Sequence, residues 1–347
     1  MATKEYWLQI EDHAWNTHPW VTSQTGMGRD NGGVDPMGPA GQVALVIRRY
    51  TAGWSHPADA PVNPWDLLEP DPTHTQGTLP GAVLEAKVGD DIVVHFRNMD
   101  RRADAPLAER THSLHPHGVQ RTALCDGAYP LSPPDATQGD ARGDRVPPGG
   151  SFTYRWSVPH RSTAGAWLYH DHGPAHEHSL MLGAFGVLRI LAPGEQPVDL
   201  PPGPVRGASD TPPNFAAVPA PPKRADYLLV FHELAGSGLC LNGRQGLANT
   251  PALLAGVGTR MTVRCVNATH DPLTLHIHGH RWQRGEDWYD TEVLGAGGAS
   301  TFGILSGSTQ DGGGPGQWLV MGHGAAGTIV GSLVVTSSGA VALTAEE

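Results

Sequence analysis

Apolar and polar residues alternate over short segments of the chain, and Gly, Pro and Asn residues separate these segments. The alternation is clear in Tyr6–Ile10, Glu85–Asn98 and Leu254–Asn267. Because successive side chains of a strand point to opposite faces, a period of two predicts strands with one buried face. The 45 Gly and 31 Pro residues favour turns and disfavour long helices. We therefore expect an all-β protein.

The two halves of the chain repeat one another. Each half has a strand, a Gly turn, an alternating strand, a His-x-His-Gly motif, a Trp-containing segment and a Gly-rich strand. Two homologous β-sandwiches of the Greek-key type are the natural interpretation. The matching segments are Glu85–Asn98 with Leu254–Asn267, Ser113–Gly118 with Thr274–Gly279, Trp167–Gly173 with Trp318–Gly324, and Gly183–Ile190 with Gly331–Val335.

Prolines concentrate between the two halves, where the alternation is lost. The segment Pro193–Pro222 holds ten of the 31 prolines, which is typical of a linker. We expect a first domain at residues 1–192, a linker at 193–224, a second domain at 225–338 and a tail at 339–347.

Charge and hydropathy exclude several classes of function. The net charge is −11 and there is no basic stripe, so we expect no nucleic-acid partner. No apolar run reaches the roughly 18 residues of a membrane span, and the N-terminus has no signal-peptide pattern, so we expect a cytoplasmic protein without a membrane partner. None of the three cysteines lies in a CxxC motif, which argues against a zinc ribbon or a disulfide framework.

Histidine is unusually abundant, with 19 residues, and imidazole is the commonest metal ligand in proteins. Residues i and i+2 of a strand share a face, so a His-x-His motif directs two imidazoles to one point. The repeat produces four such slots, and one of them has lost a histidine. Because imidazole suits copper, zinc, iron and nickel, the spacing predicts a metal centre without naming its metal. The slots are His115/His117, His170/His172, His276/His278 and Met321/His323.

The motifs Leu114–Gly118, Trp167–His172 and Leu275–Trp282 resemble those of two-domain multicopper oxidases, close to the small laccases and the ceruloplasmin-like branch. The resemblance covers most of residues 4–338 and implies two cupredoxin-like domains. It also implies a trinuclear copper cluster that reduces O2 to water, here with two or three copper ions, at the subunit interface of a homotrimer. The ligands that it implies are His115, His117, His170, His172, His276, His278 and His323.

The second half departs from the family at the type 1 copper, where electrons enter. Leu273 stands at the position of a type 1 histidine, and Gly322 stands at the position of the ligand cysteine. Met321 replaces a cluster histidine. Since a thioether binds soft Cu(I), Met321 is either a weak ligand or a packing residue.

The first half keeps more of this mononuclear slot. His112, His176 and Met181 have the spacing of the family's type 1 ligands, while Asp171 replaces the cysteine. Without a thiolate, a blue copper bond cannot form. Two interpretations stay open: these four residues hold a second metal ion, or Asp171 is structural.

Asp126, nine residues after His117, is the candidate catalytic residue. The small laccases carry an acid here that is thought to deliver protons to oxygen, a role that requires hydrogen-bond reach. The alternative is a turn residue, since Asp-Gly favours turns. Arg121 stands where those laccases have a tyrosine. No cysteine occupies a ligand position, and Cys240 and Cys265 are expected to be core thiols.

Two functions follow from these departures. The first is a copper-dependent oxidase that uses O2 and oxidises a small phenolic or aminophenol-like substrate directly at the histidine-rich centre. The lost imidazole at Met321 would leave a coordination position open, with space beside Gly322 and Gly324. The alternative is a non-catalytic copper-binding protein, in which the metal stabilises a trimer because it binds only the folded state.

Overall fold

The computed structural model describes residues 2–15, 17, 43–58, 79–133, 142–196, 223–246, 250, 252–307 and 313–336. The expected tail and residues 197–222 of the expected linker lie outside these ranges, so the domain boundaries stay a prediction. No helix within the described ranges has the length and apolar character needed to cross a membrane.

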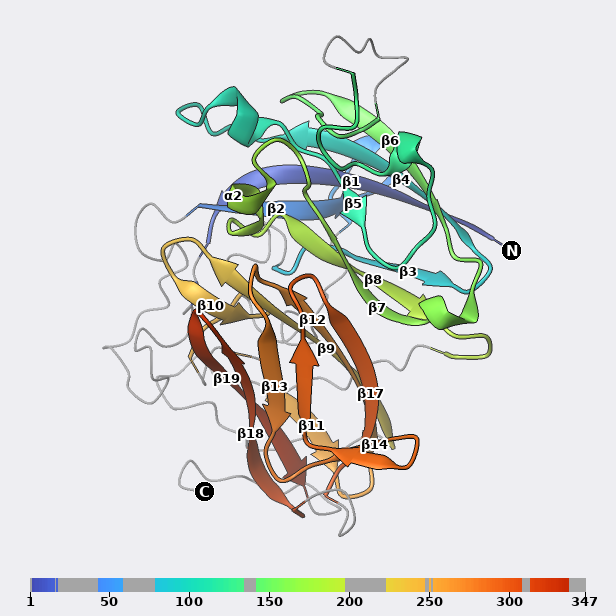
Figure 1. Ribbon diagram of the computed structural model, residues 1–347, viewed down its shortest axis with the longest axis vertical. Coiled ribbons are helices and arrows are strands. Elements are labelled where there is room, and N and C mark those ends of the chain that lie inside the picture. The colour runs from blue at the N-terminus through green and yellow to red at the C-terminus, as the bar shows by residue number, and fades with distance from the viewer. Residues whose placement is uncertain are drawn as a thin grey trace.

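The first half contains two four-stranded sheets, drawn in blue to green (Figure 1). Alternating burial supports their formation: in β1, the inward-facing Tyr6, Leu8 and Ile10 are buried. One sheet has the order β2-β1-β4-β6 and the other β3-β8-β7-β5. Their strands are β1 (Thr3–Ala14), β2 (Val43–Tyr50), β3 (Val83–Lys87), β4 (Asp91–Met99), β5 (His115–Pro116), β6 (Ser151–Ser157), β7 (Gly165–His170) and β8 (Phe185–Leu191).

The second half contains sheets of order β10-β9-β12-β17 and β11-β19-β18-β13-β16, together with the small hairpin β14-β15. These strands are yellow to red in Figure 1. Their bounds are β9 (Arg224–Leu234), β10 (Gly238–Leu241), β11 (Ala252–Gly256), β12 (Arg260–Ala268), β13 (Leu273–Ile277), β14 (Trp282–Arg284), β15 (Asp287–Tyr289), β16 (Thr291–Leu294), β17 (Ala299–Leu305), β18 (Gly316–Gly324) and β19 (Gly327–Thr336).

The helices of the described residues are short. They comprise one α-helix, α2 (His176–Leu180), and the 3₁₀ turns η1 (Ala52–Trp54), η3 (Leu107–Arg110), η4 (Ala123–Cys125) and η5 (Arg161–Thr163). The prediction of an all-β protein is therefore confirmed.

The strand pairing of the first half recurs in the second, where β16 adds one further strand beside β13. β1 runs parallel to β4 as β9 runs parallel to β12, and β3 runs parallel to β8 as β11 runs parallel to β19. β7 pairs antiparallel with β5 and β8, and its counterpart β18 pairs antiparallel with β13 and β19. The internal repeat in the sequence is therefore a repeat of topology.

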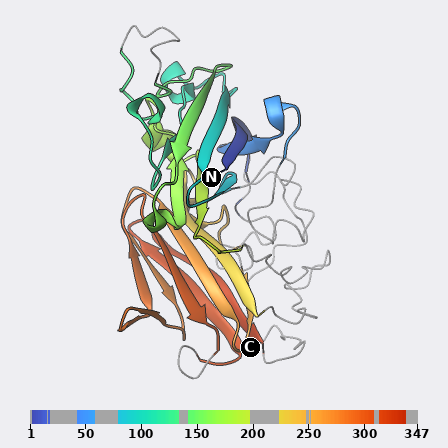
Figure 2. The same cartoon turned by 90° about the vertical axis from the view of Figure 1, so that its right-hand side faces the viewer.

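Each half has its own apolar core between its two sheets, and a third apolar cluster joins the halves. In this third cluster, Leu168 and Val187 of the first half pack with Val230 and Val266 of the second. Figure 2 shows the resulting arrangement, in which the strands of one sandwich lie above those of the other. The outer face of β7 and β8 thus fixes the two sandwiches against each other.

Candidate metal centre

Four histidines of the first half lie together at the β5–β7 edge of its second sheet. The register places His115 directly opposite His170. The ring centroids of His115 lie 5.5 Å from His117, 5.7 Å from His170 and 5.1 Å from His172. His117 and His170 are 5.3 Å apart, and His170 and His172 are 5.5 Å apart. The structure therefore brings the imidazoles of both first-half His-x-His motifs to one place.

The separation of two ring nitrogens in this group matches that of two ligands on one metal ion. His117 Nε2 and His170 Nε2 face each other at 3.2 Å. Two imidazole nitrogens bound to one metal ion at about 2.0–2.1 Å lie roughly 3–3.5 Å apart. His170 Nδ1 donates to the Asp171 carbonyl at 2.8 Å, which leaves Nε2 with its lone pair. His172 Nδ1 is buried and has no hydrogen-bond partner.

The environment keeps these rings neutral, which is the form that binds metal. Burial, together with the charge of His115, lowers the pKa of His117 from 6.5 to about 4. Burial and the neighbouring His117 and His115 lower the pKa of His170 to about 3. Neutral imidazoles suit copper and the other imidazole-binding metals.

The second half places its slot in the same register. His276 lies opposite Met321 on β13 and β18, as His115 lies opposite His170. The rings of His276 and His278 are 4.7 Å apart, and His278 Nε2 is 2.9 Å from Met321 Sδ. The thioether thus faces an imidazole nitrogen in the place of the missing ring. His323 Nδ1 contacts Thr328 Oγ1 at 3.0 Å.

In the parts of the chain that the structure describes, no ring contact or hydrogen bond joins the first-half group to the second-half group. No set of three or more His, Cys, Asp or Glu side chains among these residues is arranged to hold a metal ion. Gly297 of the second half lies beside this group, since an added Cβ there would lie 2.9 Å from His117 Cε1. Each half therefore contributes an incomplete donor set.

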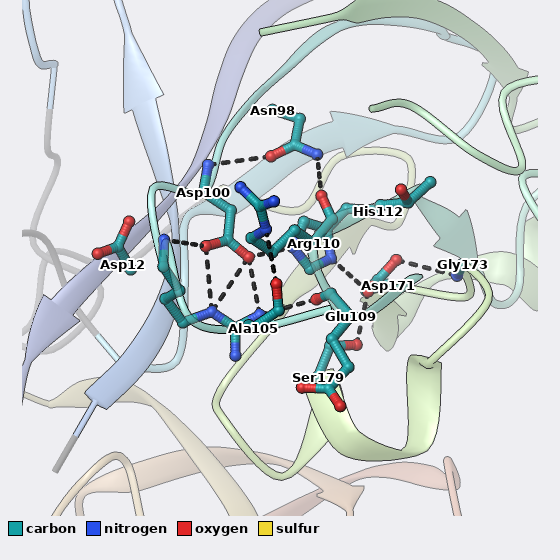
Figure 3. A network of polar contacts seen from close by, with 12 residues as sticks. Asp12, Asn98, Asp100, Ala105, Glu109, Arg110, His112, Asp171, Gly173 and Ser179 are labelled. Atoms are coloured by element: carbon teal, nitrogen blue, oxygen red, sulfur yellow. Dashed lines mark hydrogen bonds and ion pairs between the residues drawn. The ribbon is translucent and has the colours of Figure 1, made fainter. Parts of the chain in front are cut away.

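A network of charged hydrogen bonds fills the mononuclear slot of the first half (Figure 3). His112 is buried, and its Nδ1 donates to Asp171 Oδ2 at 2.7 Å while its Nε2 donates to Asp100 Oδ2 at 2.9 Å. Asp171 also accepts from the Ser113 and Gly173 amides and from the Ser179 hydroxyl. Asp100 is paired with Arg102.

Both ring nitrogens of His112 are hydrogen-bonded to carboxylates, so neither is available to a metal ion. Burial opposes the charged form of His112, but the charge of Asp171 and the hydrogen bonds to Asp100 and Asp171 raise its pKa to about 9. An imidazolium donates from both nitrogens and has no lone pair for a metal. His176 stacks on His172 at 4.2 Å, and Met181 caps α2. These contacts favour the structural interpretation of Asp171.

The corresponding slot of the second half is apolar. Leu273 is 1% exposed and belongs to the core. A Cβ on Gly322 would lie 2.6 Å from Phe231 Cε1 and 3.0 Å from Ile329 Cγ2. Gly322 therefore does not open a substrate space, contrary to expectation, because Phe231 already occupies the volume.

Asp126 lies beside the first-half histidines and contacts His115 both directly, with Oδ2 3.4 Å from His115 Nδ1, and through Arg121. Arg121 Nε donates to Asp126 Oδ1 at 2.7 Å, and Arg121 Nη2 donates to His115 Nε2 at 3.3 Å. His115 Nδ1 donates to the Asp126 carbonyl at 2.8 Å. Both nitrogens of His115 are thus already hydrogen-bonded.

Sequence reasoning missed Asp100 and the contact of Arg121, although the repeat contained a signal for Asp100. The Asp100 amide donates to Asn98 Oδ1, and the Thr269 amide donates to Asn267 Oδ1 in the same way. Cys240 and Cys265 are buried, as expected. His280 is satisfied by the His278 carbonyl and the Gly307 amide, so it is a structural neighbour of the site.

Segments of this chain are similar to known proteins. Residues 69–195, which include the four first-half histidines, match the family model described as multicopper oxidase. The chain is 34% identical to human Ferroxidase HEPHL1 over 157 residues, which is 43% of this chain and 12% of that protein. It is 29% identical to mouse hephaestin over 220 residues, 58% of this chain and 17% of that protein. It is 35% identical to Laccase-2 of Cryptococcus neoformans over 119 residues, 34% of this chain and 16% of that protein.

Solved structures share the fold over nearly the whole chain. The structure titled Multicopper Oxidase mgLAC aligns with a TM-score of 0.58 and 16% identity, over 99% of this chain and 89% of that one. Copper nitrite reductase from Nitrosomonas europaea aligns with a TM-score of 0.55 and 15% identity, over 96% and 94%. At these identities the likeness shows the fold alone, which is that of two cupredoxin-like sandwiches.

Residues 69–195 are thus similar to the multicopper oxidase family, and the resemblance inferred from the histidine motifs is confirmed. Copper is the cofactor that the matched family description implies. The matched segments span less than a fifth of each curated relative.

Proposed function

We propose that this protein is a copper-dependent oxidase that uses O2 and oxidises a small phenolic or aminophenol-like substrate directly at its histidine-rich centre. The observation that carries the proposal is the facing pair of Nε2 atoms of His117 and His170, 3.2 Å apart in a group of four neutral imidazoles. Four imidazoles gathered at one place, with the buried Nδ1 of His172 left without a hydrogen-bond partner, form a donor set that suits copper.

Backbone carbonyls orient the proposed ligands. His115, His170 and His276 direct Nδ1 to the carbonyls of Asp126, Asp171 and Asp290, at 2.8, 2.8 and 2.7 Å. A hydrogen bond at one ring nitrogen fixes the tautomer and presents the other nitrogen to a metal. In this proposal the ligands are His115, His117, His170, His172, His276, His278 and His323, with Met321 as a weak thioether ligand.

The route of electrons distinguishes this proposal from an ordinary laccase. Bound copper would supply one-electron transfer from the substrate to O2. Neither half places a thiolate at the relay position, since Asp171 and Gly322 stand there. The substrate would therefore bind beside the centre itself, and Asp126, whose carboxylate holds the Arg121 guanidinium, would supply protons on that side.

A second copy of the chain would complete each incomplete donor set, in a homotrimer. Large apolar side chains are exposed beside both sets. Tyr129 is 40% exposed, and its amide donates to the His172 carbonyl. Val293 is 69% exposed and lies opposite Thr274 on the strand that carries His276. Exposed apolar surface around a partial site favours an interface between copies.

The proposed activity is tested by loading the full chain with Cu(II) and measuring bound copper, its EPR spectrum and O2 consumption with a panel of phenols and aminophenols. We expect bound copper without a strong blue absorption band at about 600 nm, because the ligand set has no thiolate. We also expect O2 uptake, and His172→Ala or His278→Ala should reduce it. Cys240→Ser, in the core, is the matched control and should keep its copper. Copper without O2 uptake on any substrate would favour the non-catalytic alternative, which the filled slots at His112 and Leu273 support.

The proposed trimer is tested by light scattering of Val293→Asp, which puts a charge beside His276 without touching a ligand. We expect a monomer with weakened copper binding. The control is Val257→Asp, because Val257 is 49% exposed in the turn after β11. A monomeric wild-type protein that binds copper fully would refute the interfacial site.

A further inference from the structure

The four first-half histidines are not equivalent. His117 Nε2 and His170 Nε2 share one hydrogen bond at 3.2 Å, whereas His115 Nε2 accepts a hydrogen bond from Arg121 Nη2 at 3.3 Å. The second nitrogen of His115 donates to the Asp126 carbonyl. Both ring nitrogens of His115 are therefore hydrogen-bonded. The lone pair on Nε2, which a metal ion would need, is the one that accepts from Arg121.

The guanidinium is held in place by other groups. Arg121 Nε donates to Asp126 Oδ1 at 2.7 Å, and Nη1 donates to the Val119 carbonyl at 3.1 Å. The contact to His115 is the longest of the three, so the position of the guanidinium is set mainly by Asp126 and Val119. A charge-assisted bond of 2.7 Å to a carboxylate is of the strong kind.

The charge of Arg121 acts on the same place. A metal ion at His115 Nε2 would stand next to a permanent cation, since arginine does not lose its proton. The side chains of Arg121 and Asp126 are about one-fifth exposed, so water screens this repulsion only in part. Position and charge therefore both disfavour a metal ion at His115.

We propose that the Arg121 guanidinium occupies the coordination position of His115, so that the first half contributes His117, His170 and His172 to the proposed copper centre, and His115 becomes a ligand only when Arg121 is displaced. Arg121 is on this view a positioning residue that sets how many ligands the centre uses. The inference rests on the proposed copper site and refines it, because it predicts which of the proposed ligands contribute to affinity.

The test is a Cu(II) titration of the full chain, stripped of metal and competed against a chelator, with affinity as the readout. We expect His117→Ala to weaken binding by about tenfold or more, His115→Ala to change it by less than about twofold, and Arg121→Ala to tighten it by about tenfold. In the Arg121→Ala background, His115→Ala should abolish the gain. Arg189→Ala, which removes a partly exposed arginine paired with Glu85, is the control for loss of a positive charge.

Arg121→Lys separates position from charge, because lysine keeps the charge but cannot form the same fork of three donors. A gain in affinity like that of Arg121→Ala supports occupancy of the coordination position by the guanidinium. The proposal is overturned if His115→Ala weakens wild-type binding as much as His117→Ala does, if Arg121→Ala gives no gain, or if Arg121→Lys behaves as wild type while Arg121→Ala gains. None of these readouts requires turnover, so a chain that binds copper and consumes no O2 refutes the proposed activity without touching this inference.

Discussion

The two halves share one topology and one register, yet they fill the same interior slot in opposite ways. In the first half, His112 lies between the carboxylates of Asp100 and Asp171. In the second half, Leu273 and Phe231 fill the corresponding place beside Gly322. The sheets are the same around both, so the strand framework does not depend on what occupies the slot. The chemistry of the slot can change completely while the framework stays.

The charged slot of the first half and the apolar slot of the second half differ in how substitutions affect their stability. A buried ion pair costs desolvation free energy, which its partners offset only while all of them are present. An apolar slot depends on filled volume and tolerates substitutions that conserve it. The first half is therefore expected to be the more sensitive half, both to substitution and to pH.

The largest expected effect comes from putting the second-half residue into the first half. His112→Leu leaves two buried carboxylates without their shared partner, and we expect the free energy of unfolding to fall by about 3–5 kcal/mol. Urea unfolding followed by tryptophan fluorescence measures it. Leu273→Ile, the volume-conserving change in the other half, should cost less than about 1.5 kcal/mol. Equal costs in the two halves would remove the contrast.

The second effect is a pH dependence confined to the first half. The pKa of His112 rises from 6.5 to about 9 on folding, so its contribution is fully present below about pH 6.5 and is lost as pH rises through about 9. That contribution is on the order of 3 kcal/mol. Unfolding free energies measured between these limits should decline in the wild type and much less in His112→Leu. A parallel decline in both proteins would assign the pH dependence to other groups.

The third effect tests a feature that the halves have in common. Gly118 and Gly279 have φ of 74° and 66°, and an added Cβ would lie 2.1 Å from Trp167 and 2.5 Å from Trp318. We expect Gly118→Ala and Gly279→Ala each to cost about 1–3 kcal/mol, with the larger loss at Gly118. Gly285→Ala is the control, because Gly285 has φ of 61° and no atom near its Cβ position. If the control costs as much, the tryptophans are not responsible.

The smallest expected effect concerns the metal slot itself. Met321→His gives the second half the ring that the first half has at His170, and we expect Cu(II) affinity to rise by about tenfold, about 1.4 kcal/mol. The exchange in the other direction, His170→Met, should weaken binding by a similar factor. Chelator competition measures both. An unchanged affinity in Met321→His would show that the thioether is not at a ligand position.

The parts of the site that follow from strand periodicity could be read from the sequence. The His-x-His spacing and the repeat predict the four slots, and the register then places His115 opposite His170 and His276 opposite Met321. The sandwich fold follows equally from alternation and turn residues, because one buried face per strand leaves few other arrangements.

What the sequence did not reveal depends on contacts between distant segments. Asp100 reaches His112 only because β4 ends beside the loop that carries it, and Phe231 reaches Gly322 across the core from β9. Arg121 covers His115 because a carboxylate and a carbonyl hold it there. No periodicity predicts such a contact, since side-chain reach and hydrogen-bond competition decide it.

The strand pairing also sets an order for synthesis. In the first half, β1 pairs with β4 and β3 pairs with β8, so its sheets are complete once residue 191 has left the ribosome. The second half can close only when β19 reaches β11, at the very end of the described chain. Because domains generally fold as units, N-terminal first, the first sandwich can form while the second is still being made. Its exposed β7–β8 face would then be the template on which β9 and β12 assemble.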